Sequence, residues 1–350
     1  MTREDRQKRK QKRRQARLAQ RKHFRRSLPK TAAEWGDDER DAPDVGEPFD
    51  EEFAELGDMP SPFLMERSFR AMHRSIGDHE FASPDELSGF LNANFIGKPT
   101  SAGAKFDDPV EQAQELAYQA METRDPFIGA RLAKKALNLD PNCLDALVIN
   151  TFVTTSDTGR RIALIKEALK TAEGLFGPDF FEENRGHFWG IVETRPYMRA
   201  RETLSELLLK AGRTSEAVAN YEDMLDLNPN DNQGIRFTLL GLYFCEGDLT
   251  GAQRLLAQYE GDATAVFAWG RVLERFLCGN IPGAANALAA ARRGNAHVEP
   301  YLTGAKSPPA QLPEYMTFGG ESEAAECADK LGEAWAKHPE AVRWLRRSRA

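Results

Sequence analysis

The stretch LSELLLKAGRTSEAVANYEDMLDLNP, residues 204–229, decides the fold. Its apolar residues recur at helical spacing on both sides of the KAGR segment. Small residues such as Ala217 let two helices approach each other, and large ones such as Tyr221 fill the space between them. Pro229 ends the second helix, because proline cannot continue it. The stretch therefore predicts a pair of antiparallel helices and no strand.

The same spacing recurs elsewhere in the chain. ALNLDPN at 136–142 and MLDLNPN at 224–230 are the same helix ending. The glycine-to-alanine spacing of the first stretch returns 35 residues later, at Gly247 and Ala252, and once more at Gly279 and Ala284. A hairpin that ends at Pro141, and a degenerate one after it, bring the total to about five, more than the three or so that a stack of hairpins needs.

These spacings are those of a known repeat. Counting Met198 as position 1 places Leu204 at 7, Ala217 at 20, Tyr221 at 24 and Pro229 at 32. The chain therefore resembles proteins built from the 34-residue tetratricopeptide repeat. The resemblance implies an all-α solenoid of helical hairpins, whose inner groove binds proteins or peptides.

Two longer segments narrow the resemblance. An ETRP motif at 193–196 precedes a helix pair, and a PYL segment near residue 300 precedes a proline-rich crossing and a final helix pair. In these features residues 110–347 are similar to a bacterial branch of tetratricopeptide proteins like the suppressor-of-tumorigenicity-seven-like family. The resemblance implies a helical repeat protein and lends no catalytic residue.

Composition and charge divide the chain into parts. Residues 1–26 hold 13 Lys and Arg against two acids, a net charge of +11, although the whole chain carries −7. Residues 1–26 contain too few apolar residues to form a packed core. We expect a basic disordered tail at 1–26, an acidic linker at 27–58, a small helical unit at 59–100, a repeat solenoid at 108–300 interrupted at 174–196, and a proline-rich crossing with a C-terminal helical cap at 301–350.

The totals exclude some classes of protein. No stretch approaches the roughly 20 apolar residues that span a bilayer, and no apolar run follows the basic start as in a secretory signal. The four cysteines lie far apart without metal-ligand spacing, so we expect reduced thiols. A cytoplasmic protein without a transmembrane segment is predicted.

The stretch FFEENRGHFWGIVETRPYMRAR, residues 180–201, raises an enzyme hypothesis. Glu183 and His187 lie one helical turn apart, but a zinc site needs a third ligand and the HExxH spacing is absent. The chain holds no Gly-rich phosphate loop, no GxSxG motif and no Cys/His nucleophile pair. Bulky residues such as Phe188 and Trp189 suit a structural role, plugging the break in the repeats. We therefore predict neither a catalytic residue nor a cofactor.

Candidate binding residues follow from the repeat positions that face the inner groove. The third repeat offers Arg199, Glu202 and Glu206 there, and the next offers Phe237 and Phe244. Two rings beside an arginine and two acids suit a peptide with a basic and an apolar anchor. The alternative is that both phenylalanines belong to the core.

The loop NPNDNQGIR, residues 228–236, is rich in side chains that bond backbone groups. We predict a polar network there that locks neighbouring hairpins together. A ligand clamp is the alternative, and it adds Arg195, Tyr197, Asn232 and Arg236 to the candidates.

The first functional hypothesis is thus a scaffold that binds a protein or peptide partner. The second is tethering to RNA, DNA or an anionic membrane surface through the basic tail, since Lys and Arg clusters bind phosphates regardless of sequence. Phe24 is the only aromatic residue in that tail, which disfavours base stacking. An enzyme that uses the region of His187 is the third.

Overall fold

The computed structural model describes residues 63–77, 79, 81–95, 108–313 and 315–348. The expected tail at 1–26 and linker at 27–58 lie outside these residues. The helices are α2 (Leu64–Gly77), α3 (Pro84–Asn94), α4 (Pro109–Glu122), α5 (Pro126–Leu139), α6 (Leu144–Thr154), α7 (Thr158–Phe176), α8 (Pro178–Asn184), α9 (Arg195–Lys210), α10 (Thr214–Leu227), α11 (Ile235–Glu246), α12 (Leu249–Gln258), α13 (Ala265–Leu277), α14 (Ile281–Gly294), α15 (Val298–Leu302), α16 (Glu321–Lys337) and α17 (Pro339–Arg347).

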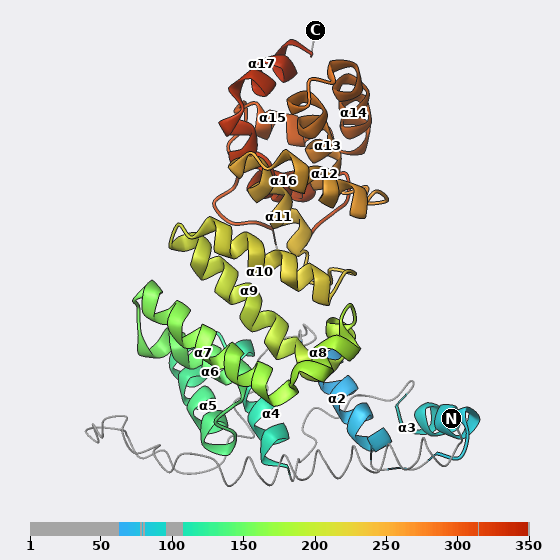
Figure 1. The fold of residues 1–350 in the computed structure, drawn as a ribbon, viewed down its shortest axis with the longest axis vertical. Coiled ribbons are helices and arrows are strands. Elements are labelled where there is room, and N and C mark those ends of the chain that lie inside the picture. Colours follow the sequence, from blue (N-terminus) through green and yellow to red (C-terminus); the bar gives the residue numbers. More distant parts are fainter. Residues whose placement is uncertain (1–62, 78, 80, 96–107, 314, 349–350) are drawn as a thin grey trace. The chain divides into compact units, whose positions relative to one another are not determined.

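Five pairs of consecutive helices pack as hairpins, and they follow one another along the chain (Figure 1). The pairs are α4 with α5, α6 with α7, α9 with α10, α11 with α12, and α13 with α14. No strand occurs in the part of the chain that the structure describes. The prediction of an all-α solenoid of helical hairpins is confirmed.

The turn inside three hairpins uses one local device. Gly212, Gly247 and Gly279 all have positive φ, near 70 to 75°, where only glycine is free of strain. After each of them the next amide donates to a carbonyl five residues earlier, as in Arg213 N to Leu208 O at 2.8 Å. This bond satisfies a carbonyl that the end of the helix would otherwise leave unpaired.

Packing explains the alanine that follows each of these glycines. Ala217, Ala252 and Ala284 are fully buried, so their hairpins leave no room for a larger side chain. Tyr221, the large residue of the quoted stretch, is buried as well. The spacing that identifies the repeat is therefore the spacing of contacts between its two helices.

Between α7 and α9 the chain runs through α8 and two 3-10 turns, Phe188–Gly190 and Val192–Thr194. Five rings meet there, with neighbouring centroids 5.0 to 6.5 Å apart. The rings belong to Phe176, Phe180, Phe181, Phe188 and Tyr197. This aromatic cluster packs against the core shared by α7, α9 and α10.

The helix α16 packs on α11 and α13, the first helices of the last two hairpins. Its Trp335 is fully buried, and the indole ring lies 6.5 Å from that of Trp269 in α13. At Gly241 of α11 an added Cβ would lie 2.2 Å from the carbonyl oxygen of Lys330. The backbones of α11 and α16 are therefore in direct contact.

Candidate helix-docking site

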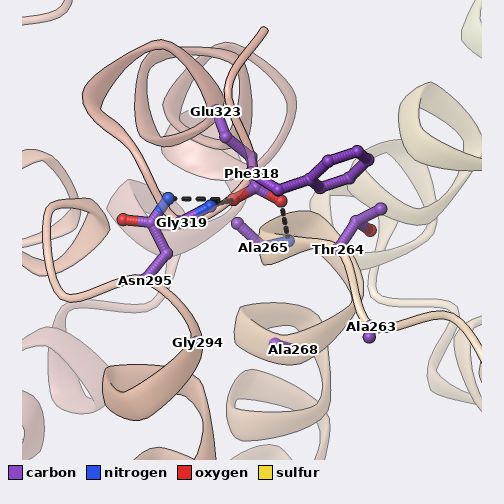
Figure 2. A pocket seen from close by; sticks show the side chains of 9 residues that line it. All are labelled: Ala263, Thr264, Ala265, Ala268, Gly294, Asn295, Phe318, Gly319 and Glu323. Atoms are coloured by element: carbon purple, nitrogen blue, oxygen red, sulfur yellow. Dashed lines mark hydrogen bonds between the residues drawn. The ribbon is translucent and has the colours of Figure 1, made fainter.

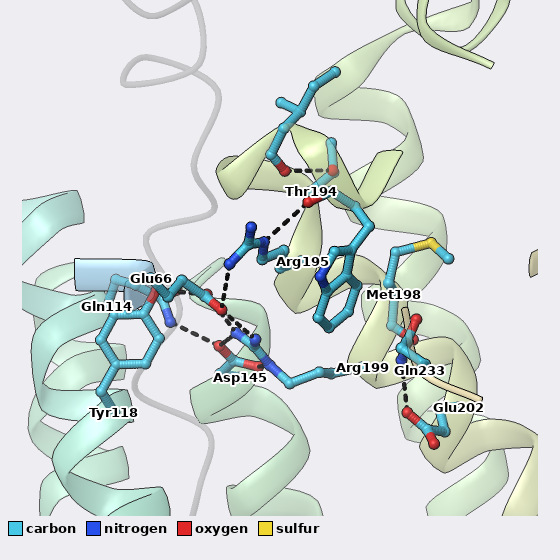
Figure 3. Close-up of polar contacts among 12 residues, drawn as sticks. Glu66, Gln114, Tyr118, Asp145, Thr194, Arg195, Met198, Arg199, Glu202 and Gln233 are labelled. Atoms are coloured by element: carbon cyan, nitrogen blue, oxygen red, sulfur yellow. Dashed lines mark hydrogen bonds and ion pairs between the residues drawn. The ribbon is translucent and has the colours of Figure 1, made fainter. Parts of the chain in front are cut away.

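The helix α2 lies against α4 and α9, the first helices of the first and third hairpins (Figure 3). We call the residues that receive it the α2 docking face. They are Glu111, Glu115, Tyr118 and Glu122 of α4 and Arg195 and Arg199 of α9. Asp145 of α6 supports this face by pairing with Arg199.

The centre of the contact is the carboxylate of Glu66, which is only 4% exposed. Arg199 donates Nη1 to its Oε2 at 2.9 Å and Nη2 to its Oε1 at 3.1 Å. The hydroxyl of Tyr118 donates to Oε1 at 2.6 Å, and Arg195 Nη1 lies 3.7 Å from Oε2. A buried carboxylate needs such partners, because an unpaired charge in the interior is costly.

Arg199 connects this carboxylate with a second one (Figure 3). It donates from Nε and Nη2 to Asp145, at 3.0 and 2.5 Å, and Asp145 also accepts from Gln114 at 2.6 Å. Burial alone would lower the pKa of Arg199, but the two carboxylates outweigh it and hold that pKa above its ordinary value. Arg199 therefore stays a cation that joins α2, α6 and α9.

Two arginines of α2 pair with the acids of α4. Arg67 forms a salt bridge with Glu115 at 2.9 Å and another with Glu122 at 2.7 Å. Arg70 pairs with Glu111 at 2.8 Å. The three acids are spaced four and seven residues apart, so they form one stripe along α4.

Aromatic rings complete the contact. Phe63 stacks on Tyr118 with centroids 5.0 Å apart, and the Arg199 guanidinium lies 5.4 Å from the Phe63 ring. The guanidinium of Arg195 lies 5.5 Å from the ring of Phe69 and 5.3 Å from that of Trp189. Cation–π contacts of this kind add attraction wherever arginine meets a ring.

The structure brings only part of the predicted binding set together. Arg195 and Arg199 belong to the docking face, where both contact Glu66. Tyr197 is buried in the aromatic cluster, and its hydroxyl donates to Glu173 at 2.8 Å. Glu206 and Asn232 are exposed.

Glu202 lies half-buried near α11, where it accepts a 2.6 Å hydrogen bond from Gln233 Nε2. Phe244 is buried in the core, and its carbonyl oxygen lies 3.3 Å from His338 Nε2. The helix α16 and the following His338 thus cover this part of the predicted groove.

Arg236 joins the loop before α11 to the loop before α13. It forms salt bridges with Asp231 and Asp262, both at 2.8 Å, and its guanidinium lies 4.2 Å from the Phe237 ring. Asp231 also accepts the amide of Ile235 at 2.7 Å and so caps α11. Burial opposes ionisation of Asp262, but hydrogen bonds from Thr264 and Arg236 lower the pKa of Asp262 overall. These contacts are those of a network that holds neighbouring hairpins together.

His187 is exposed at the start of the first 3-10 turn, and its backbone amide donates to Asn184. No three His, Cys, Asp or Glu side chains among the described residues could hold a metal ion together. Burial raises the pKa of the Cys143 thiol to about 12, so this thiol is not a nucleophile.

A cavity of about 360 Å³ lies where α13 begins, between Ala268, Asn295 and Phe318 (Figure 2). The buried carboxylate of Glu323 borders it. That carboxylate accepts from the amides of Ala265 and Gly319, at 2.9 and 2.7 Å, and from Asn295 at 3.0 Å. Glu323 thus holds the C-terminal segment on the start of α13, and its hydrogen bonds are all within the fold.

Sequence inspection missed Glu66, Tyr118 and Asp145 as members of the site. A signal was present, since Glu66 is the only acid in an otherwise basic and apolar helix, and Asp145 follows the apolar start of α6. A lone acid of this kind is usually solvated, so its burial shows only once the partners are in place.

A family model for the tetratricopeptide repeat matches residues 208–268, from the end of α9 into α13. The chain contains tetratricopeptide repeats. This confirms the repeat, whereas the resemblance to suppressor-of-tumorigenicity-seven-like proteins stays a prediction. A comparison with curated proteins finds no match. Among the described residues no helix is long and apolar enough to cross a membrane.

Proposed function

We propose that this protein is a non-enzymatic scaffold that binds a protein or peptide partner through its tetratricopeptide hairpins. Such repeats commonly mediate protein–protein interaction. One observation carries the proposal: the first helices of the hairpins already hold a separate helix, α2, by paired charges and stacked rings. A surface that binds a helix of its own chain has the chemistry to bind one from a partner.

The proposed contact residues are Arg195 and Arg199 of the docking face, together with the exposed Glu206 and Asn232. A cytoplasmic location is part of the proposal. It is supported by the four cysteines, none of which forms a disulfide.

Affinity capture from cell extract, read by quantitative mass spectrometry, tests the function. The bait is the full chain, and its control is the full chain with the 13 Lys and Arg of residues 1–26 replaced by Ser. The scaffold function predicts a partner that both baits retain in near-equal amounts. Capture that depends wholly on the basic residues contradicts it and supports tethering to a polyanion.

A further inference from the structure

Two helices cover the first helices of the hairpins, and they are held in different ways. The helix α16 buries Cys327, Leu331 and Trp335 completely, and its backbone contacts α11 at Gly241. Removing a large apolar side chain that is in full contact destabilises a protein strongly, because a cavity is left behind. The helix α16 is therefore a permanent part of the core.

The helix α2 is attached mainly by charge. Among its described side chains only Glu66 is buried, the apolar ones are half-buried, and Met65 is 64% exposed. Its ion pairs are those of Arg67 and Arg70 with the acids of α4, and of Glu66 with two arginines. The side chains in these pairs are shielded from water, with exposed fractions of 22% or less, so a face left empty would hold unpaired acids and arginines. A competing helix that brings the same charges restores every pair, so it can exchange with α2 without leaving a buried charge unpaired.

The contacts of the docking face define which side chains a competing helix needs. Its two arginines receive an acid, and the acidic stripe of α4 receives arginines one and four positions after that acid. Tyr118 offers its ring to an aromatic residue placed like Phe63, three positions before the acid. The Arg195 guanidinium lies beside a ring placed like Phe69, three positions after the acid. This order of charges and rings selects one helix direction and one register.

We propose that the α2 docking face is a binding site for an amphipathic helix of a partner protein with this order of an acid, two arginines and two rings. The helix α2 occupies the site in competition with the partner. The inference rests on the proposed scaffold function and names its ligand class. The measured affinity of a partner equals its affinity for the free face multiplied by the fraction of molecules in which α2 is undocked.

The test uses the full chain and a fluorescein-labelled peptide FLMERSFRAMHRSIG, the sequence of residues 63–77, with binding followed by anisotropy. In the protein variant Arg67→Glu/Arg70→Glu, the acids of α4 repel the resident helix α2. We expect it to bind the peptide about tenfold or more tightly than the parent protein, because the face is then free. Met65→Gln, an exposed position of the same helix, serves as the matched control and should bind like the parent.

A charge exchange makes the test specific. Glu111→Arg/Glu115→Arg, introduced into the parent protein, should repel the resident helix and should also abolish binding of the natural peptide, because both carry the arginines of positions 67 and 70. The same protein should bind a peptide in which the two arginines are glutamates. Circular dichroism and melting curves show whether each variant folds. If one of the two variants fails to fold, binding of the matching peptide by the other variant provides the test.

Equal binding of the natural peptide by the parent protein and by Arg67→Glu/Arg70→Glu overturns the inference. An affinity for the natural peptide that is unchanged by Glu111→Arg/Glu115→Arg overturns the inference as well. Either failure leaves the affinity capture untouched. If affinity capture still yields a partner although α2 cannot be displaced, that partner binds another surface. The scaffold function then stands, and only the proposal for the α2 docking face is wrong.

Discussion

Phe188 is the residue on which the break between α7 and α9 depends. Its ring is fully buried and contacts three other rings of the aromatic cluster. Phe188→Ala should destabilise the protein by about 3–5 kcal/mol, since the cavity forms where little can collapse into it. Thermal unfolding measures the loss. The adjacent and exposed His187→Ala is the control, and we expect it to change stability by no more than about 0.5 kcal/mol.

Equal melting of the Phe188 and His187 variants would show that the cluster contributes no stability. Trp189 should matter less than Phe188, because it is half-buried and lies beside the Arg195 guanidinium. The sequence stretch that raised the enzyme hypothesis is thus explained by packing at Phe188 and by the contact of Arg195 with Glu66.

Glu202 gives stability a dependence on pH. Burial raises the pKa of Glu202 above its ordinary value of 4.5, although the hydrogen bond from Gln233 opposes this shift. The folded protein therefore holds this proton more tightly than the unfolded chain does. The contribution of Glu202 to stability is complete below pH 4.5 and is lost as the pH rises through the raised pKa.

We expect Glu202→Gln to gain stability relative to the parent as the pH rises above 4.5, and to show no such gain at lower pH. Melting temperatures across a pH series measure the difference. Glu167→Gln, at an exposed position of α7, should follow the parent closely. A constant difference between Glu202→Gln and the parent at every pH would contradict the assignment.

At the scale of elements, the contact of α11 with α16 decides how the C-terminal part is held. An alanine at position 241 would place its Cβ 2.2 Å from the Lys330 carbonyl oxygen, so the two helices must separate. We expect Gly241→Ala to destabilise the protein by about 1–3 kcal/mol, the usual cost of overpacking.

Gly332→Ala is the matched control on the partner helix α16. Nothing lies within 4 Å of a Cβ added there, so the better helix propensity of alanine should stabilise by up to about 1 kcal/mol. Chemical denaturation of both variants compares them directly. Opposite signs support the close backbone contact, and a stabilising Gly241→Ala would disprove it.

At the scale of the whole molecule, the charge distribution supports a prediction about residues 1–26. Their net charge of +11 should bind a polyanion such as heparin, and the logarithm of the affinity should fall linearly with the logarithm of the salt concentration. Fluorescence titration of the full chain at several salt concentrations measures the slope. The chain with Ser in place of those Lys and Arg should lose the binding. Affinity that is independent of salt would refute the prediction.

The sequence by itself determined the hairpins. Helical period, left-handed glycines such as Gly212 and stops such as Pro229 act within a few residues, so they can be recognised without knowing the rest of the fold. Buried alanines such as Ala217 could also be predicted, because the repeat spacing is a local consequence of two helices in contact.

Of the site, the sequence indicated Arg199 through its repeat position and Arg195 through the possible ligand clamp, but not what they bind. Only the tertiary structure decided that Glu66, 133 residues away from Arg199, supplies the partner carboxylate. Only the tertiary structure showed that α16 packs against α11 at Gly241, and that Phe244, one turn later in α11, is buried. The physical reason is that helix period shows that a face is covered, whereas the segment that covers it is chosen by charge and shape between distant parts of the chain.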